Sequence, residues 1–121
     1  MRMTGRSANL IAIVFLWVLS GCYAEKSVSG RPVSRDMADV LVRYRVNRWE
    51  LNVSGLPECK KEELPPQSGD DVEIFRLPER RGVADAFTYR IVLDMPTRRY
   101  WVIRSGGFRA TLDVYGPGEI N

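Results

Sequence analysis

The sequence predicts a small α+β domain, in which a short N-terminal helix is followed by an antiparallel β-meander. Two observations predict this class. Apolar residues recur at helical spacing between residues 35 and 45, and three segments of the carboxyl half alternate apolar and polar residues between turn sequences. An all-β fold is the alternative, because residues 42–47 also alternate as a strand would.

The helical segment has both a hydrophobic face and a start signal. Ser34 or Asp36 suits the N-cap, and Asp39 suits the first turn, where the helix dipole favours negative charge. We expect a short helix here that passes into a strand near residues 49–53. Its apolar face follows the i, i+3, i+4, i+7 pattern: Met37, Val40, Leu41 and Tyr44.

The predicted meander has three strands, at residues 87–94, 99–104 and 108–115, and a shorter strand at 72–77 precedes it. Pro96 lies in the first turn and Gly106-Gly107 in the second, where glycine permits positive φ. Alternation predicts that two sets of side chains point to one core: Phe87, Tyr89, Ile91 and Leu93 from the first strand, and Phe108, Ala110, Leu112 and Val114 from the last.

The opposite face of this meander is the candidate binding site. Arginine and tyrosine side by side suit anionic or planar groups, or a protein interface. The same residues also suit the wet face of an antiparallel sheet, where arginine stems cover apolar surface. The candidate residues are Arg90, Tyr100, Arg104, Arg109 and Tyr115.

The amino terminus has the pattern of a secretory signal peptide. Arg2 and Arg6 precede an unbroken apolar run of ten residues, 10–19. A membrane-spanning helix needs about 20 such residues. A basic start followed by a short apolar run is typical of a signal peptide instead.

The end of the apolar run, Leu19-Ser20-Gly21-Cys22, resembles the lipobox of bacterial lipoproteins. The resemblance implies a lipid on Cys22, cleavage before it, and acyl chains that anchor the protein in a membrane. Tyr23 replaces the aspartate that favours inner-membrane retention, which implies an outer-membrane anchor facing the periplasm. Ordinary secretion with cleavage after Ala24 and an uncleaved anchor are the alternatives.

These features divide the chain into three parts: a signal peptide at 1–21, a lipidated cysteine with a flexible tether at 22–34, and one small domain at 35–121. Without Arg2 and Arg6, 18 basic residues become 16 against 15 acidic ones, so charge argues against nucleic acid as a partner.

Several kinds of chemistry are excluded by composition. The chain has no histidine, which excludes Ser-His-Asp and Cys-His catalysis and histidine metal sites, and two cysteines cannot build a thiolate metal site. We expect no enzyme activity, no metal and no cofactor. Cys59 is expected to be a partly buried, inert thiol; the alternatives are an intermolecular disulfide and a thiol whose pKa is lowered by Lys60 and Lys61.

The expected function is therefore non-catalytic binding of another envelope protein by a membrane-anchored lipoprotein. It would serve as a subunit of an envelope assembly or as an immunity-type inhibitor of a periplasmic toxin. The alternative is a module that binds the cell wall or anionic lipid through the arginine-tyrosine face.

Overall fold

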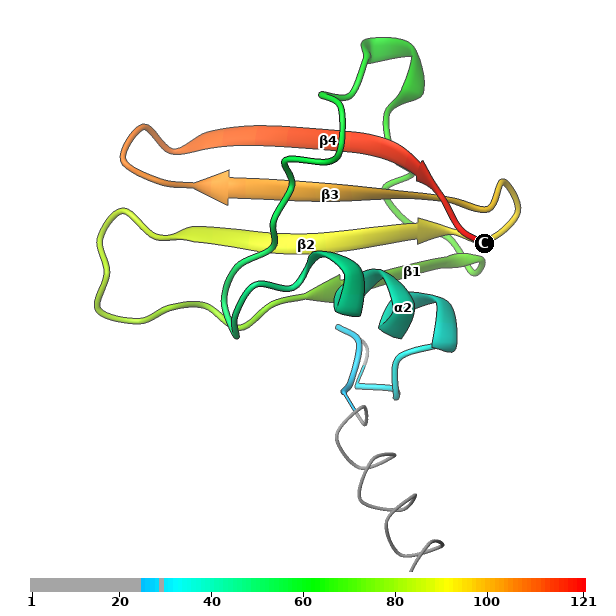
Figure 1. Cartoon of the computed structure of the whole chain (residues 1–121), viewed down its shortest axis with the longest axis horizontal. Helices are drawn as coiled ribbons and strands as arrows, with labels where there is room; N and C mark the ends of the chain where they lie inside the picture. Colours follow the sequence, from blue (N-terminus) through cyan, green and yellow to red (C-terminus); the bar gives the residue numbers. More distant parts are fainter. Residues whose placement is uncertain (1–24, 29) are drawn as a thin grey trace, which may run out of the picture.

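One short helix and a four-stranded antiparallel sheet form the main regular structure of residues 25–28 and 30–121, the part of the chain that the computed structural model describes. The predicted signal peptide and Cys22 lie outside these residues. In chain order the elements are α2 (Arg35–Tyr44), the 3₁₀ helix η1 (Lys61–Glu63), β1 (Val72–Arg76), β2 (Phe87–Asp94), β3 (Arg99–Gly106) and β4 (Thr111–Glu119) (Figure 1).

The strands lie in the order β1-β2-β3-β4, with every neighbouring pair antiparallel, so the predicted meander is confirmed. The segment predicted as a separate short strand joins it as β1. Among the described residues a single ten-residue helix lies beside four strands, so this part of the chain is mostly sheet and lies between the α+β class and the all-β alternative.

Helix α2 begins where the sequence predicts. The Ser34 Oγ accepts a hydrogen bond from the Met37 backbone N–H at 3.1 Å, which satisfies one of the free donors of the first turn. The helix ends at Tyr44, and the predicted strand at 49–53 does not form. Instead, the Asn47 side chain accepts hydrogen bonds from the backbone N–H groups of Trp49 and Glu50, which holds a turn in place of a strand.

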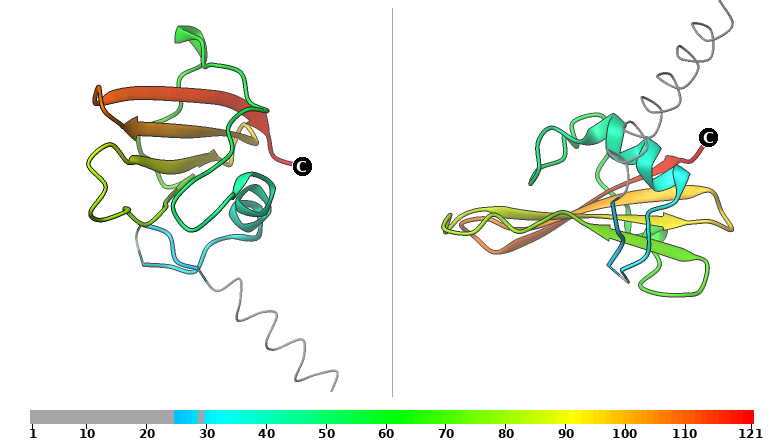
Figure 2. Two further views of the ribbon diagram at one scale, coloured as in Figure 1. Left: turned by 60° about the vertical axis from the view of Figure 1, so that its left-hand side comes forward. Right: turned by 90° about the horizontal axis from the view of Figure 1, so that it is seen from below.

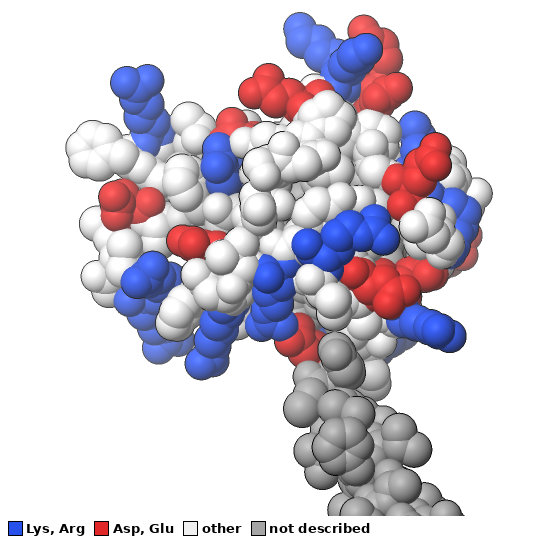
Figure 3. Space-filling view, viewed as in Figure 1, with Lys and Arg blue, Asp and Glu red and all other residues white. Residues whose placement is uncertain are grey.

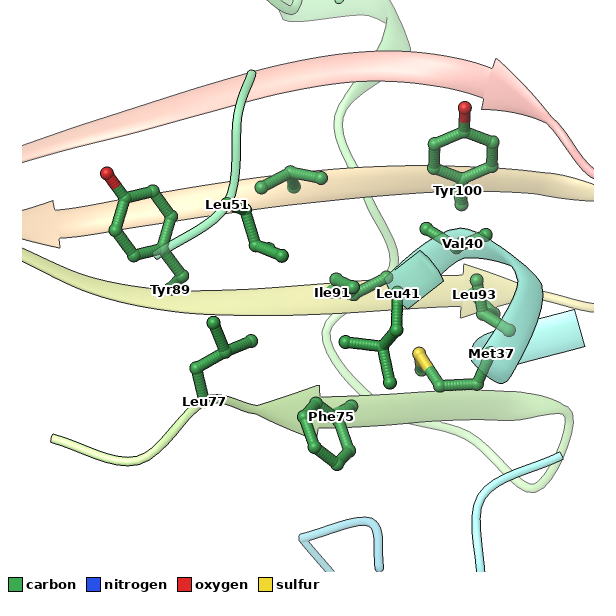
Figure 4. Packing of buried hydrophobic residues seen from close by; sticks show 11 residues of the cluster. Met37, Val40, Leu41, Leu51, Phe75, Leu77, Tyr89, Ile91, Leu93 and Tyr100 are labelled. Carbon is green, nitrogen blue, oxygen red and sulfur yellow. The ribbon is translucent and has the colours of Figure 1, made fainter. Parts of the chain in front are cut away.

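One face of the sheet packs against α2 (Figures 2 and 4). Figure 4 shows Met37, Val40 and Leu41 of the helix directed at this face. The residues of β2 that point toward the helix are those predicted from alternation, with Phe87 packed at the rim. The buried cluster comprises Met37, Val40, Leu41, Leu51, Phe75, Leu77, Tyr89, Ile91, Leu93, Tyr100 and Val102.

The far face of the sheet is also covered in part. The chain that follows η1 crosses behind the sheet, whereas α2 lies in front of it (Figure 1). The Trp101 indole N–H donates to the Glu63 carbonyl at 2.8 Å, and the Cys59 backbone N–H donates to the Val114 carbonyl at 2.8 Å. A second buried cluster of Val92, Trp101 and Ile103 forms beneath this segment.

The first described residues pack on the domain, which differs from the flexible tether predicted for 22–34. Lys26 and Pro32 form an antiparallel bridge, and the Val28 N–H donates to the Ile74 carbonyl of β1 at 3.3 Å. Glu25 forms an ion pair with Arg45. Residues 25–28, and the described chain from Gly30 onward, therefore belong to the folded unit.

Gly116 provides the first testable prediction, because both its backbone conformation and a steric clash disfavour a side chain at this position. Its φ is +121°, and a Cβ would lie 2.9 Å from the Tyr100 backbone carbonyl oxygen. We expect Gly116→Ala to lower the free energy of unfolding by about 1–3 kcal/mol, since strained backbone and a rigid clash add.

Gly55→Ala is the matched control, because a Cβ there meets nothing within 4 Å. It should change stability by less than about 0.5 kcal/mol in the same urea titration. Equal effects of the two substitutions would show that the β3–β4 contact at Gly116 is not rigid.

Candidate binding surfaces

The five residues predicted to form one binding face do not share a face. Arg90 lies on the far side of the sheet, since its strand neighbours Tyr89 and Ile91 point toward α2. Tyr100, Arg104 and Tyr115 lie on the α2 side, and Arg109 lies in the turn between β3 and β4. The prediction of a single arginine-tyrosine face is therefore wrong. Its five residues, which the structure places in different parts of the sheet, are Arg90, Tyr100, Arg104, Arg109 and Tyr115.

Tyr100 is part of the core. Its side chain is 2% exposed, its hydroxyl lies 2.5 Å from the Tyr44 hydroxyl, and Arg43 donates to it at 3.4 Å. Burial, followed by the hydrogen bond with Tyr44, raises the pKa of Tyr100 to about 12, although Arg43 acts in the opposite direction. This pair joins α2 to β3 and leaves the Tyr100 ring out of reach of a ligand.

Arg104 is held by its own neighbours. Its guanidinium donates to Asp113 at 3.0 and 3.3 Å and lies 4.6 Å from the Phe87 ring centroid and 5.5 Å from that of Tyr115. Partial burial disfavours the cation, but the hydrogen bond to Asp113 and nearby tyrosine outweigh it and raise the pKa of Arg104. The arginine stabilises the end of the sheet, and its charge already has a partner.

Arg90 borders an apolar groove on the far face of the sheet. The groove has a volume of about 330 Å³ and lies between the strands and the residues that follow η1. Leu64 and Leu112, at its margin, are 59% and 64% exposed. The lining comprises Leu64, Pro65, Pro66, Gln67, Ile74, Arg90, Val92, Ile103, Leu112 and Val114.

A smaller polar hollow adjoins this groove and shares Arg90 with it. Its volume is about 170 Å³, and Arg76, Glu79 and Thr88 contribute to its lining. Arg76 and Arg90 are paired across β1 and β2 and therefore point to the same side of the sheet.

The sequence predicted the position of Arg90 but not the groove. Alternation placed Arg90 away from the α2-side core, but it gave no sign of the groove, because the wall residues 64–67 have no periodic pattern.

The tip of the β3–β4 hairpin presents an exposed aromatic side chain. Phe108 is 95% exposed, although alternation predicted that it points inward. The reason is the length of the turn: Gly107 and Ala110 both have positive φ, so Phe108 and Arg109 belong to the turn and not to β4. The glycine pair in the sequence marked the turn, but not its extent.

Cys59 is the partly buried thiol that the sequence favoured. Its Sγ lies 3.1 Å from the Glu63 carbonyl, and its side chain packs beside the second buried cluster. Burial raises the pKa of the Cys59 thiol, so the alternative of a thiol activated by Lys60 and Lys61 is wrong.

Charges of both signs lie on the α2 side of the molecule, with uncharged surface between them (Figure 3). Within residues 25–28 and 30–121, no three acidic or thiol side chains come together as a metal site would require. No helix in the described part of the chain is long and apolar enough to span a membrane.

Comparisons of the chain with protein-family models, curated proteins and solved structures find no match.

Tyr100 gives a prediction about alkaline pH. The folded state favours its neutral form, so the stability it contributes is complete below its ordinary pKa of 10.0 and is lost as the pH rises toward about 12. The free energy of unfolding should therefore fall between these values in urea titrations of the wild type. The free energy of unfolding of the Tyr100→Phe variant should fall less steeply over the same pH range. An identical slope for the variant and the wild type would contradict a raised pKa of Tyr100.

Proposed function

We propose that the chain is a small envelope lipoprotein that is anchored in a bacterial membrane through Cys22 and binds another envelope protein without catalysis. The lipobox resemblance supports the anchor, and Tyr23 favours the outer membrane, with the domain facing the periplasm. The partner would be a component of an envelope assembly or a periplasmic toxin that this protein inhibits.

Phe108 is the observation on which the binding proposal rests. A phenylalanine exposed to 95% at the tip of a hairpin leaves its whole ring in water, where burial by a partner would be favourable. Arg109 stands next to it and is also exposed. Aromatic and arginine side chains are the residues that most often dominate binding energy at protein interfaces.

The short distance from the anchor to the domain is consistent with this arrangement. Only Tyr23 and Ala24 separate Cys22 from Glu25, which the ion pair with Arg45 holds on the domain. Three extended residues span about 10 Å, so a lipid on Cys22 would keep the domain close to the membrane surface.

The alternative function is a module that binds anionic lipid or the cell wall. Of the predicted residues, Arg90 is the one whose surroundings favour this alternative. Tyr100 is buried and Arg104 is paired with Asp113, so neither offers a free group to a ligand.

The partner-binding proposal predicts the effect of removing the exposed ring. Phe108→Ser should reduce at least tenfold the recovery of one dominant protein after crosslinking in the producing cells and purification through the lipidated chain. Tenfold corresponds to about 1.4 kcal/mol, within the range of interface hot spots.

The matched control for this substitution is Val42→Ser on α2, where the wild-type side chain is 64% exposed and lies far from the hairpin in sequence. It should leave recovery unchanged. Equal recovery with Phe108→Ser and with the wild type would refute the hairpin tip as the binding surface.

The proposed lipid anchor on Cys22 can be tested by the mass of the mature protein. Material extracted from native membranes should begin at Cys22 and be heavier than the unmodified chain by the mass of its acyl groups in intact mass spectrometry. A chain that begins at Glu25 would instead indicate ordinary secretion.

A further inference from the structure

We propose that the groove and the adjoining polar hollow form a binding site for a fatty acyl carboxylate. The aliphatic chain would lie in the groove, and Arg90 would hold the carboxylate at its polar end. This site is separate from Cys22 and Phe108, so it depends neither on the anchor nor on the protein partner.

The groove has the chemistry of an aliphatic chain along its length. Eight of its ten lining residues are aliphatic or proline, and the other two are Gln67 and Arg90. Its volume of about 330 Å³ is within the range of small-molecule sites. Leu64 and Leu112 stay largely exposed at its margin, and an apolar ligand would remove them from water.

A peptide suits this groove less well than an acyl chain. The strands that form its floor use their backbone groups in the sheet, and the outer carbonyls of Ile74 and Val114 already accept hydrogen bonds from Val28 and Cys59. Pro65 and Pro66 in the wall have no N–H to donate. A peptide backbone would therefore lose its water without gaining partners, whereas an acyl chain has no polar groups to satisfy.

The charge at the polar end selects an anion. Arg76 and Arg90 are cross-strand neighbours, and among the described residues neither of their side chains takes part in an ion pair or hydrogen bond. Glu79 contributes one opposing carboxylate to the hollow. Two guanidinium groups against one carboxylate leave a positive site, and arginine binds carboxylate oxygens through paired N–H groups.

Hydroxyl groups complete the polar end. Thr88 and Ser105 both line the hollow, and their side-chain oxygens lie 2.7 Å apart on the same side of the sheet as Arg90. The site thus changes from aliphatic to polar along its length, as a fatty acid does.

Photolabelling of the full chain in phosphatidylcholine nanodiscs tests the proposal. The probe is a ten-carbon carboxylate with a diazirine at the end of its chain, and the matched probe is the alcohol of the same length. The carboxylate should label residues 64–67 and 112–114, as mapped by peptide mass spectrometry, and should label them at least fivefold more than the alcohol does.

Variants distinguish the site from general partitioning into the bilayer. Arg90→Gln should reduce carboxylate labelling at least fivefold and leave alcohol labelling unchanged, whereas Arg48→Gln, at an exposed position outside the groove, should change neither. Leu112→Glu, which places a carboxylate at the margin, should reduce labelling by both probes. Even labelling across the surface, equal labelling by acid and alcohol, or no effect of Arg90→Gln would overturn the proposal, and none of these results would bear on partner binding through Phe108.

Discussion

The burial of the central strands β2 and β3 on both faces is the constraint on which the rest of this fold depends. Each strand points apolar side chains in both directions: Ile91, Leu93 and Val102 toward α2, and Val92, Trp101 and Ile103 away from it. A sheet that is apolar on both faces needs a cover on each. Helix α2 provides one, and the chain around η1 provides the other through the hydrogen bond from Trp101 to Glu63.

Both candidate surfaces lie where these covers end. The η1 segment continues into Leu64-Pro65-Pro66, and proline removes the N–H donors that a helix or strand would need, so the segment arches over the sheet and leaves the groove. The β3–β4 hairpin extends past α2, as Figures 1 and 2 show. Phe108 lies in the turn of this hairpin. The same architecture thus accounts for the exposed groove and the exposed ring.

The sequence predicted the elements of this fold better than the faces of its strands. In β2 the polar residues Thr88 and Arg90 alternate with apolar ones, and this strand was oriented correctly. In β3 the run from Tyr100 to Ile103 is apolar at every position, so period-2 alternation cannot say which side faces the helix. The register that pairs Leu93 with Tyr100 decides it, and register depends on turn geometry that composition does not encode.

The docked start of the chain gives the proposed anchor a consequence for orientation. Glu25 forms an ion pair with Arg45, the residue after α2, and residues 25–28 lie below the helix in Figure 1, whereas the β3–β4 turn lies at the left end of the sheet. A long flexible tether would let the domain present any surface to the membrane. A connection of about 10 Å restricts it to orientations in which Glu25 is near the lipid. Under the proposed anchor, the hairpin tip, which extends sideways from the sheet in Figure 1, would then stay within reach of a second envelope protein.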